Sequence, residues 1–328
     1  MKICYWTPNA GGGAGKYEHY LPKEIEKLGA KVEVFRRPKG LKGNPITLRL
    51  LYRSNGDIVH ATSQTLSIYS YPKPNNFVVT VHDIYSLHRS LMARIKRSLI
   101  NKVLQRADKI IAVSEFTKGE IIEQMKIDED KIEVVPMGVD LSMYKPMNKE
   151  TCKRALGLNV DEKHILVVAS NAPHKRMDIT KAVFKEVMKC REKIKLLKVG
   201  YGQTLEGQGI INLGFVPEEK MPIVYNAADV LLHTSEYEGF GMPLLEAMAC
   251  GLPIVASNKA AIPEVVGECG RLVDLDSEDC IERFVEEILD CIDRDKKNRK
   301  GVKRAMKFSW EMIAKKTMKI YEELLNVA

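Results

Sequence analysis

Short runs rich in Val, Ile and Leu alternate with amphipathic stretches along the chain, and this alternation constrains the fold more than any other feature of the sequence. Apolar runs this short and continuous are typical of strands buried on both faces of a parallel sheet, with helices between them. In the first half, the expected strands are 2–7, 31–35, 57–62, 77–82, 109–114 and 132–136, and the amphipathic helices include 16–28 and 91–107. In the second half, the expected strands are 164–170, 195–200, 209–213, 229–234, 253–257 and 270–273.

The repetition of this pattern predicts an α/β protein with two Rossmann-like, doubly wound parallel-sheet domains that face a cleft. A chain of 328 residues suits two domains of roughly 150 residues each. We expect an N-terminal domain over residues 1–150, a C-terminal domain over 151–309, and a final helix over 310–328 that packs back on the first domain. Ligands of such sheets bind beyond the carboxyl ends of the strands, so residues at those ends are candidates for function.

The composition is that of a soluble globular protein, with 45% apolar and 29% charged residues and no apolar run near the ~20 residues of a membrane span. The chain enters its first strand at Lys2 without a signal-peptide pattern, and its seven cysteines form no CxxC pair, so we expect reduced thiols and a cytoplasmic location. The whole formal net charge of +8 falls on residues 1–150, which suits an anionic membrane or a phosphorylated acceptor. Nucleic acid is disfavoured, because aromatic and basic residues are not interleaved there.

The segment 238–246, with the sequence EGFGMPLLE, combines a turn with the start of a helix. A strand is expected to end just before it, and Pro243 suits the first turn of a helix that Gly251 would close. The free N–H groups of such a helix start bind anions, and glycines let a diphosphate approach the backbone. Glu246 lies about one turn into the helix, where it can accept hydrogen bonds from ribose hydroxyls, and Glu238 can accept them from a sugar. The residues alone leave open a purely structural turn and helix.

Glu238 and Glu246, with seven residues between them, are followed by AMACGLPIVAS at 247–257 and IPEVVG at 262–267. Together these segments closely resemble glycosyltransferase family 4, the retaining glycosyltransferases of the GT-B fold. The resemblance extends over nearly the whole chain through weaker segments in the family's order, at 11–15, 81–83, 114–140, 214–216 and 309–321.

The resemblance implies roles for individual residues. Glu238 would contact the transferred sugar, Glu246 the ribose, and Val216 would flank the base. His82, at the end of an expected strand, resembles a family histidine that reaches the donor sugar, so His82 and Glu238 are the candidate catalytic residues. The candidate donor-binding residues are Gly13, Asn171, Lys175, Arg176, Val216, Gly239, Phe240, Gly241 and Glu246.

Within this set, Lys175 resembles the family's phosphate-binding lysine, and one nearby position departs from the family. Ser170 stands where the family usually has an arginine. Arg176, where the family often has glycine, is the candidate for supplying the missing charge, because a guanidinium suits phosphate oxygens. The glycine loop at 11–15 borders the donor phosphates and the acceptor in the family, and Gly13 is the expected contact.

The expected activity is transfer of a hexose from a nucleoside-diphosphate sugar, of the GDP-mannose or UDP-hexose type, to a glycan, lipid-linked or small-molecule acceptor. The C-terminal domain would bind the donor and the basic N-terminal domain the acceptor. The Asp-x-Asp pairs at 128–130, 274–276 and 293–295 lie away from any Gly-rich donor loop, so no metal and no cofactor besides the donor co-substrate are expected. A GT-B-fold nucleotide-sugar epimerase and a non-catalytic nucleotide-sugar-binding subunit are the alternatives.

The predicted helix 91–107 carries an apolar stripe that is surrounded by Lys and Arg. Core packing of the stripe with a solvated basic face is the first interpretation, and contact with anionic lipid at the cytoplasmic membrane face is the second. The residues of the stripe are Leu91, Ile95, Leu99, Val103 and Ala107.

Overall fold

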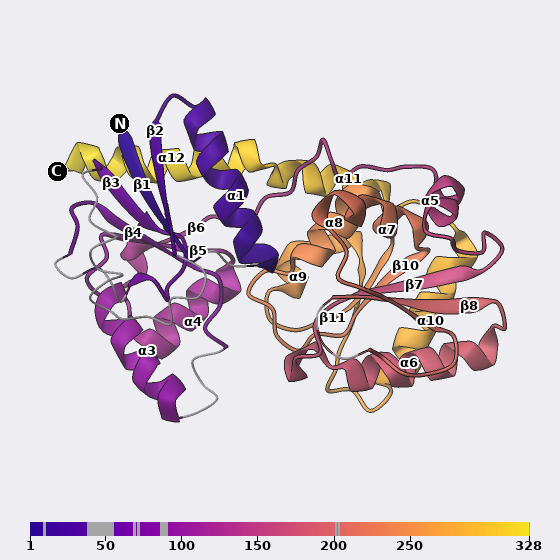
Figure 1. The fold of residues 1–328 in the computed structure, drawn as a ribbon. Helices are drawn as coiled ribbons and strands as arrows, with labels where there is room; N and C mark the ends of the chain where they lie inside the picture. The colour runs from indigo at the N-terminus through magenta and orange to yellow at the C-terminus, as the bar shows by residue number, and fades with distance from the viewer. Residues whose placement is uncertain are drawn as a thin grey trace. The chain divides into compact units, whose positions relative to one another are not determined.

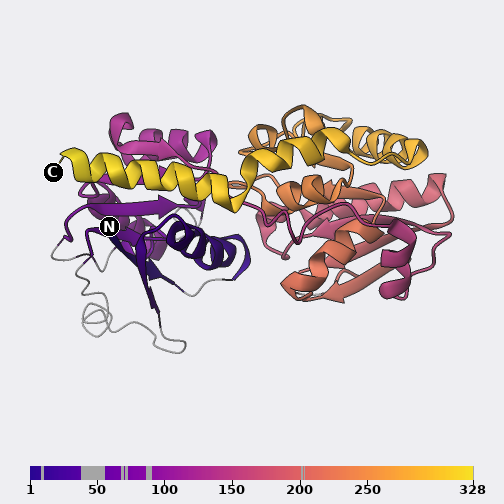
Figure 2. The same cartoon turned by 90° about the horizontal axis from the view of Figure 1, so that it is seen from above.

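The computed structural model describes residues 1–8, 11–37, 56–67, 70, 73–85, 91–200, 202 and 204–327, with the backbone alone at 91–94, 96 and 327. The chain divides into two compact units, each built on one sheet (Figures 1 and 2). The first unit contains Met1–Gly138 and Trp310–Ala328, and the second contains Val139–Ser309. Within the first unit, the last helix of the chain packs against the first one, α12 (Trp310–Val327) on α1 (Gly12–Lys27).

The sheet of the first unit has the order β2-β1-β3-β4-β5-β6, and all of its neighbouring strands are parallel. The direction of winding changes between β1 and β3, because β2 lies on the other side of β1. Each of the six strands predicted for this half is present. Their bounds are β1 Lys2–Thr7, β2 Lys31–Arg36, β3 Ile58–Ala61, β4 Phe77–Val81, β5 Lys109–Ala112 and β6 Ile132–Val134.

Helices cover both faces of this sheet (Figure 1). On one face, α3 (Leu91–Leu104) and α4 (Glu115–Met125) contribute buried residues such as Ile100 and Ile121 to the core formed with the central strands. On the other face lie α1 and α12. The sequence sets the start of α4 locally, because the Ser114 side chain accepts a hydrogen bond from the N–H of Thr117, as an N-cap residue does.

The sheet of the second unit has the order β12-β11-β10-β7-β8-β9, again with parallel neighbours. This is the Rossmann order, in which the chain winds outward from β7 to β9 and then crosses back to β10. The switch point therefore lies between β7 and β10, which are paired neighbours. All six strands predicted for this half are present. Their bounds are β7 Lys163–Val168, β8 Ile194–Val199, β9 Ile210–Gly214, β10 Val230–His233, β11 Ile254–Ser257 and β12 Arg271–Val273.

Helices also cover both faces of the second sheet (Figure 1). On one face, α6 (Met177–Cys190) and α10 (Cys280–Arg294) share a core with the strands. On the other face, α8 (Met242–Cys250) packs beside α7 (Met221–Ala227), and α5 (Lys149–Ala155) packs on α7. The remaining helices are α9 (Ile262–Val266) and α11 (Arg299–Ala305).

Two sequence predictions about the first unit are wrong in detail. Helix α1 begins at Gly12 rather than at residue 16, so the glycines expected to form a loop belong to its first turn. In α3, Ile95 and Leu99 were expected to be buried, but each is 51% exposed, whereas Ile100 and Leu104 are fully buried. Leu91 belonged to the same stripe, but its side chain lies outside the described residues.

Among the residues that the structure describes, no helix is long and apolar enough to span a membrane.

Candidate functional site

The Rossmann switch point brings two candidate residues into direct contact. Lys175 ends the short 3-10 turn that follows β7, and Glu238 lies in the loop that follows β10. The Lys175 ammonium is 2.6 Å from Glu238 Oε1, and the backbone N–H of Glu236 donates to the carbonyl of His174 at 2.8 Å, which joins the two loops. Because β7 and β10 are far apart in sequence, this contact follows from sheet order and not from local spacing.

A third residue, which the sequence analysis missed, completes this cluster. His233 ends β10, and its Nε2 lies 2.9 Å from the same Glu238 oxygen. Burial alone would raise the pKa of Glu238, but the adjacent His233 ring and the charge of Lys175 hold it far below its ordinary value. Glu238 is therefore ionised at neutral pH, and the contacts described for it fall on Oε1, which leaves Oε2 to accept another hydrogen bond. The sequence signal that could have identified His233 is a polar residue at the last position of an otherwise apolar strand.

The turn after Glu238 leads directly into the N-terminus of α8. Gly241 caps this helix with a φ of 100°, and a Cβ there would lie 2.8 Å from Leu244 Cδ1. The positive φ therefore favours glycine at this position, while the contact with Leu244 involves only the end of a side chain. Pro243 occupies the first turn and Gly251 closes the helix at a φ of 72°, as the sequence predicted. The free N–H groups of this helix start form a positive end beside the Glu238 cluster.

Glu246 lies one turn into α8 and is 3% exposed. Its Oε2 accepts a hydrogen bond of 2.8 Å from the Tyr225 hydroxyl, which belongs to α7. Burial raises the pKa of Tyr225 well above its ordinary value, so the tyrosine stays a donor. No sequence motif indicates this partner, because Tyr225 comes from a different helix of the same layer.

The remaining candidates of the second unit occupy loops at the carboxyl ends of the strands. Arg176 has a left-handed backbone with a φ of 48°. Its guanidinium contacts Asp178 and, at 3.5 Å, Glu236, so its charge is balanced by carboxylates in this structure. Asn171 lies against Gly202, where a Cβ would be 3.2 Å from the asparagine side chain. Val216 follows β9 and is half-buried. The candidate residues Gly239, Phe240 and Gly241 are buried in the turn before α8.

The two candidates of the first unit also lie at the carboxyl edge of their sheet. Gly13 is in the first turn of α1, and His82 follows β4 directly. The Nε2 of His82 is 2.9 Å from the carbonyl oxygen of Thr62, and the ring packs edge-on against Tyr17. Burial lowers the pKa of His82, so the ring is neutral at neutral pH. With Nε2–H donating to Thr62, the lone pair of Nδ1 is the available acceptor.

Two of the three Asp-x-Asp pairs, those at 274–276 and 293–295, form ion pairs with basic residues of the second unit. Asp274 and Asp276 contact Lys259, and they precede α10, which begins after Asp279. Asp295 forms ion pairs with Lys149 and Lys163. In the part of the chain that the structure describes, no three His, Cys, Asp or Glu residues are grouped as metal ligands.

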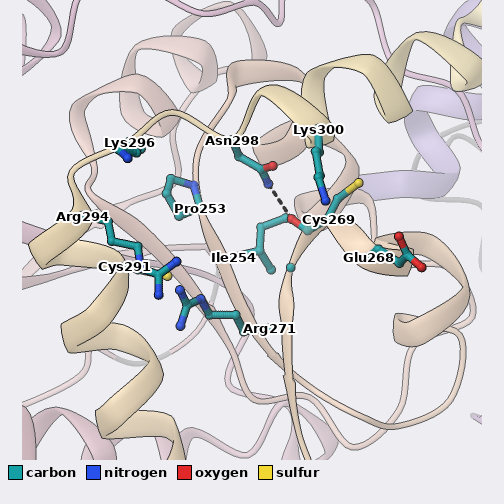
Figure 3. Close-up of a pocket in the computed structure, with 11 residues that line it drawn as sticks. Pro253, Ile254, Glu268, Cys269, Arg271, Cys291, Arg294, Lys296, Asn298 and Lys300 are labelled. Carbon is teal, nitrogen blue, oxygen red and sulfur yellow. Dashed lines mark hydrogen bonds between the residues drawn. The ribbon is translucent and has the colours of Figure 1, made fainter.

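A cavity of about 350 Å³ opens elsewhere in the second unit (Figure 3). It lies where β11 and β12 begin, at the amino ends of the strands, whereas Lys175 and Glu238 follow carboxyl ends. Two arginines, Arg271 and Arg294, approach each other on its wall (Figure 3). Both contact Asp290, so their charges are balanced within the wall. None of the candidate residues lines this cavity.

Comparison with known proteins identifies a family. Residues 162–294 match the model described as Glycosyl transferases group 1, and residues 36–143 match Glycosyltransferase Family 4. The O-antigen chain mannosyltransferase B of Escherichia coli is 30% identical over 78% of this chain and 74% of its own length. The D-inositol 3-phosphate glycosyltransferase of Segniliparus rotundus is 31% identical over 69% of this chain, which spans 54% of that relative. Among solved structures, Anabaena HepE in complex with UDP-glucose aligns with a TM-score of 0.79 at 21% identity, over 98% of this chain and 100% of that one.

Proposed function

The chain belongs to glycosyltransferase family 4 and is a GT-B glycosyltransferase, and we propose that it transfers a hexose, with retention of anomeric configuration, from a nucleoside-diphosphate sugar to an acceptor hydroxyl. The donor would be of the GDP-mannose or UDP-hexose type. The acceptor would be a glycan, a lipid-linked sugar or a small molecule. The similarity to a mannosyltransferase and to a protein bound to UDP-glucose supports this choice of donor class.

The observation that carries the proposal is the position of Glu238 between a cation and a helix start. Lys175 and the N–H groups that open α8 provide two sources of positive charge for a diphosphate. Lys175 can exchange its contact from Glu238 to a phosphate oxygen, because both are anions. Glu238 then keeps His233 and offers Oε2 to a hydroxyl of the transferred sugar. Glu246 would accept hydrogen bonds from the ribose.

The ionisation of Glu238 favours a positioning role over proton transfer. Its pKa lies far below neutral pH, so it carries no proton to donate. In the proposed reaction the bond between the sugar C1 and the diphosphate oxygen breaks, and the acceptor oxygen bonds to C1 on the same face. The leaving phosphate oxygen takes the acceptor proton. Lys175 and the α8 start stabilise the charge that develops on that phosphate.

His82 would support the positive charge that develops on the sugar ring. The neutral imidazole has its Nε2–H directed to Thr62 O and an Nδ1 lone pair available. A lone pair stabilises developing positive charge or accepts a hydrogen bond from a sugar hydroxyl.

We propose no divalent metal, because Lys175 and the α8 start already supply positive charge. Transfer should therefore persist in EDTA, and added Mg²⁺ or Mn²⁺ should not raise its rate.

Contact of the first unit with an anionic membrane is a further part of the proposal. Two apolar side chains of α3, Ile95 and Leu99, are each 51% exposed, and Lys102 lies on the same helix. Exposed apolar side chains next to basic ones suit the interface of an anionic bilayer. Such contact would bring the enzyme to a lipid-linked acceptor.

A panel of UDP-, GDP- and ADP-sugars in a thermal-shift assay identifies the donor. Mass analysis of products from that donor and an acceptor mixture then tests transfer. We expect acceptor products one hexose heavier, and loss of at least ~100-fold in transfer for Glu238→Gln and His82→Ala with nucleotide binding retained. An isomerised donor of unchanged mass would instead indicate an epimerase, and binding without nucleotide release a non-catalytic subunit. Wild-type rates in both variants would refute the assigned roles.

A further inference from the structure

Lys198, near the end of β8, is a buried lysine that has no acidic partner among the described residues. Its side chain is 2% exposed. The ammonium donates to the carbonyl oxygen of Ala169 at 2.7 Å and approaches that of Val199 at 3.5 Å, and it forms no ion pair with any residue that the structure describes. Burial lowers its pKa, and no carboxylate in the described part of the chain acts in the opposite direction.

Burying a charge in this way is costly. A lysine ammonium taken out of water is stabilised by a compensating anion and has a lowered pKa without one, and backbone carbonyls provide partial charges only. Other lysines of this unit are paired, as Lys153 is with Asp229 at 3.4 Å although it is equally buried. A hydrocarbon side chain would fill the Lys198 position at lower cost. The charge at Lys198 therefore calls for an anion that binds to the protein.

The backbone around Lys198 departs from regular strand geometry. The register between β8 and β9 shifts between Lys198 and Val199, as in a bulge that re-aims a side chain. The next residue but one, Gly200, has a φ of 128°, and a Cβ there would lie 2.3 Å from the carbonyl oxygen of Ala169. This is the oxygen that accepts from Lys198. The glycine thus permits the end of β8 to approach the loop after β7.

That loop continues into the candidate donor site. It runs from Ala169 through Asn171 to the 3-10 turn that ends at Lys175. Because β7 and β8 are paired neighbours, Lys198 and Lys175 belong to the same carboxyl edge of the sheet. Residue 170, which follows the carbonyl that holds Lys198, is a serine and brings no charge of its own.

We infer that Lys198 contributes to binding of the donor diphosphate. Its ammonium, which donates to the carbonyl oxygen of Ala169 at the start of the loop after β7, attracts the diphosphate electrostatically, while Lys175 contacts it directly. This inference rests on the proposed function. Lys198 would attract the diphosphate by its charge without touching it, because charges interact more strongly in a poorly hydrated environment than in water. The bound diphosphate supplies the negative charge that the free protein lacks at this position.

The test compares affinities for a nucleoside diphosphate and for its uncharged nucleoside by isothermal titration calorimetry, with the base chosen from the thermal-shift panel. Lys198→Met removes the charge and the hydrogen bond, whereas Lys198→Gln removes the charge and keeps an N–H donor for Ala169. Lys195→Met is the matched control, because Lys195 is on the same strand and is paired with Glu162 near the surface. Ser170→Arg in the Lys198→Met background returns a cation to the adjacent residue.

We expect both Lys198 variants to bind the nucleoside diphosphate at least ~10-fold more weakly, with nucleoside affinity unchanged. Lys195→Met should match wild type, and Ser170→Arg should restore part of the loss. Unchanged diphosphate affinity in Lys198→Gln, or an equal loss for nucleoside and diphosphate, would overturn the inference and leave the proposed function intact. If Lys198→Met does not fold, Lys198→Gln decides by itself. Wild type that binds no nucleoside diphosphate would overturn the proposed function and the inference together.

Discussion

Lys175→Met removes the cation that contacts Glu238 and tests whether charge holds this cluster together. The ammonium and Glu238 Oε1 are 2.6 Å apart, and the two side chains are 17% and 12% exposed, so the pair is largely shielded from water. Hydrogen bonds between charged groups contribute ~1.5–3 kcal/mol, and His233 still contacts the same oxygen after the substitution. We therefore expect the free energy of unfolding to fall by about 2 kcal/mol.

The matched control is Lys189→Met. Lys189 and Glu186 are also close, at 2.7 Å, but they are 62% and 41% exposed. Exposed pairs contribute little, so this variant should lose less than ~0.5 kcal/mol. Urea titrations followed by circular dichroism provide both values. Equal stability of Lys175→Met and Lys189→Met would refute the electrostatic account of the cluster.

A double-mutant cycle and its pH dependence sharpen the test. With Glu238→Gln, the cycle should give a coupling of at least ~1 kcal/mol, and additive effects would contradict direct pairing. The folded-state pKa of Glu238 is held below its ordinary value of 4.5. As pH falls, the unfolded carboxyl therefore takes up a proton first, so the stability difference between wild type and Lys175→Met should be constant above pH 4.5 and shrink below it.

Three further predictions concern other parts of the chain. Burial lowers the pKa of His60 to about 3, so the ring is protonated in the unfolded chain before it is in the folded one. Below pH ~6.5 the free energy of unfolding should therefore fall by up to ~1.4 kcal/mol per pH unit. The urea midpoint of His60→Asn should depend less on pH than that of wild type, and an identical dependence would contradict this explanation. Gly241→Ala should weaken donor binding by ~10-fold in calorimetry because of its positive φ, whereas Gly119→Ala, inside α4 with open space around it, should not. Replacing both Ile95 and Leu99 by serine should reduce co-sedimentation with anionic liposomes, and unchanged binding would remove the membrane hypothesis.

The sequence predicts the strands well because their signal is local. Runs of Val, Ile and Leu such as those of β4 and β7 are buried on both faces and have few other interpretations. The same reasoning fails where two interpretations have similar local support. In α3 the stripe through Leu99 and the stripe through Ile100 both have helical spacing, and packing against β-strands decides for Ile100. The glycines of α1 have low helix propensity, yet the helix begins at Gly12.

The site residues also fall into two groups: those that a local motif reveals and those that only the folded sheet brings together. The turn before α8 and the position of Glu246 follow from neighbouring residues, so a motif reveals them. The contacts of Lys175 and His233 with Glu238 depend on β7 lying beside β10, which only the order of the sheet determines. Lys198 was not singled out, because a lysine in a strand is usually solvated, and its burial becomes evident in three dimensions.

Hydrogen exchange of the amides, with and without the donor, tests most directly where the donor binds. We predict slower exchange in peptides that cover 239–246 and 173–176, where the N–H groups at the α8 start and Lys175 would contact the diphosphate. Peptides that line the cavity at the amino ends of β11 and β12, at 268–271 and 294–300, should exchange at the same rate in both states. Protection confined to that cavity, or none at 239–246, would contradict the account.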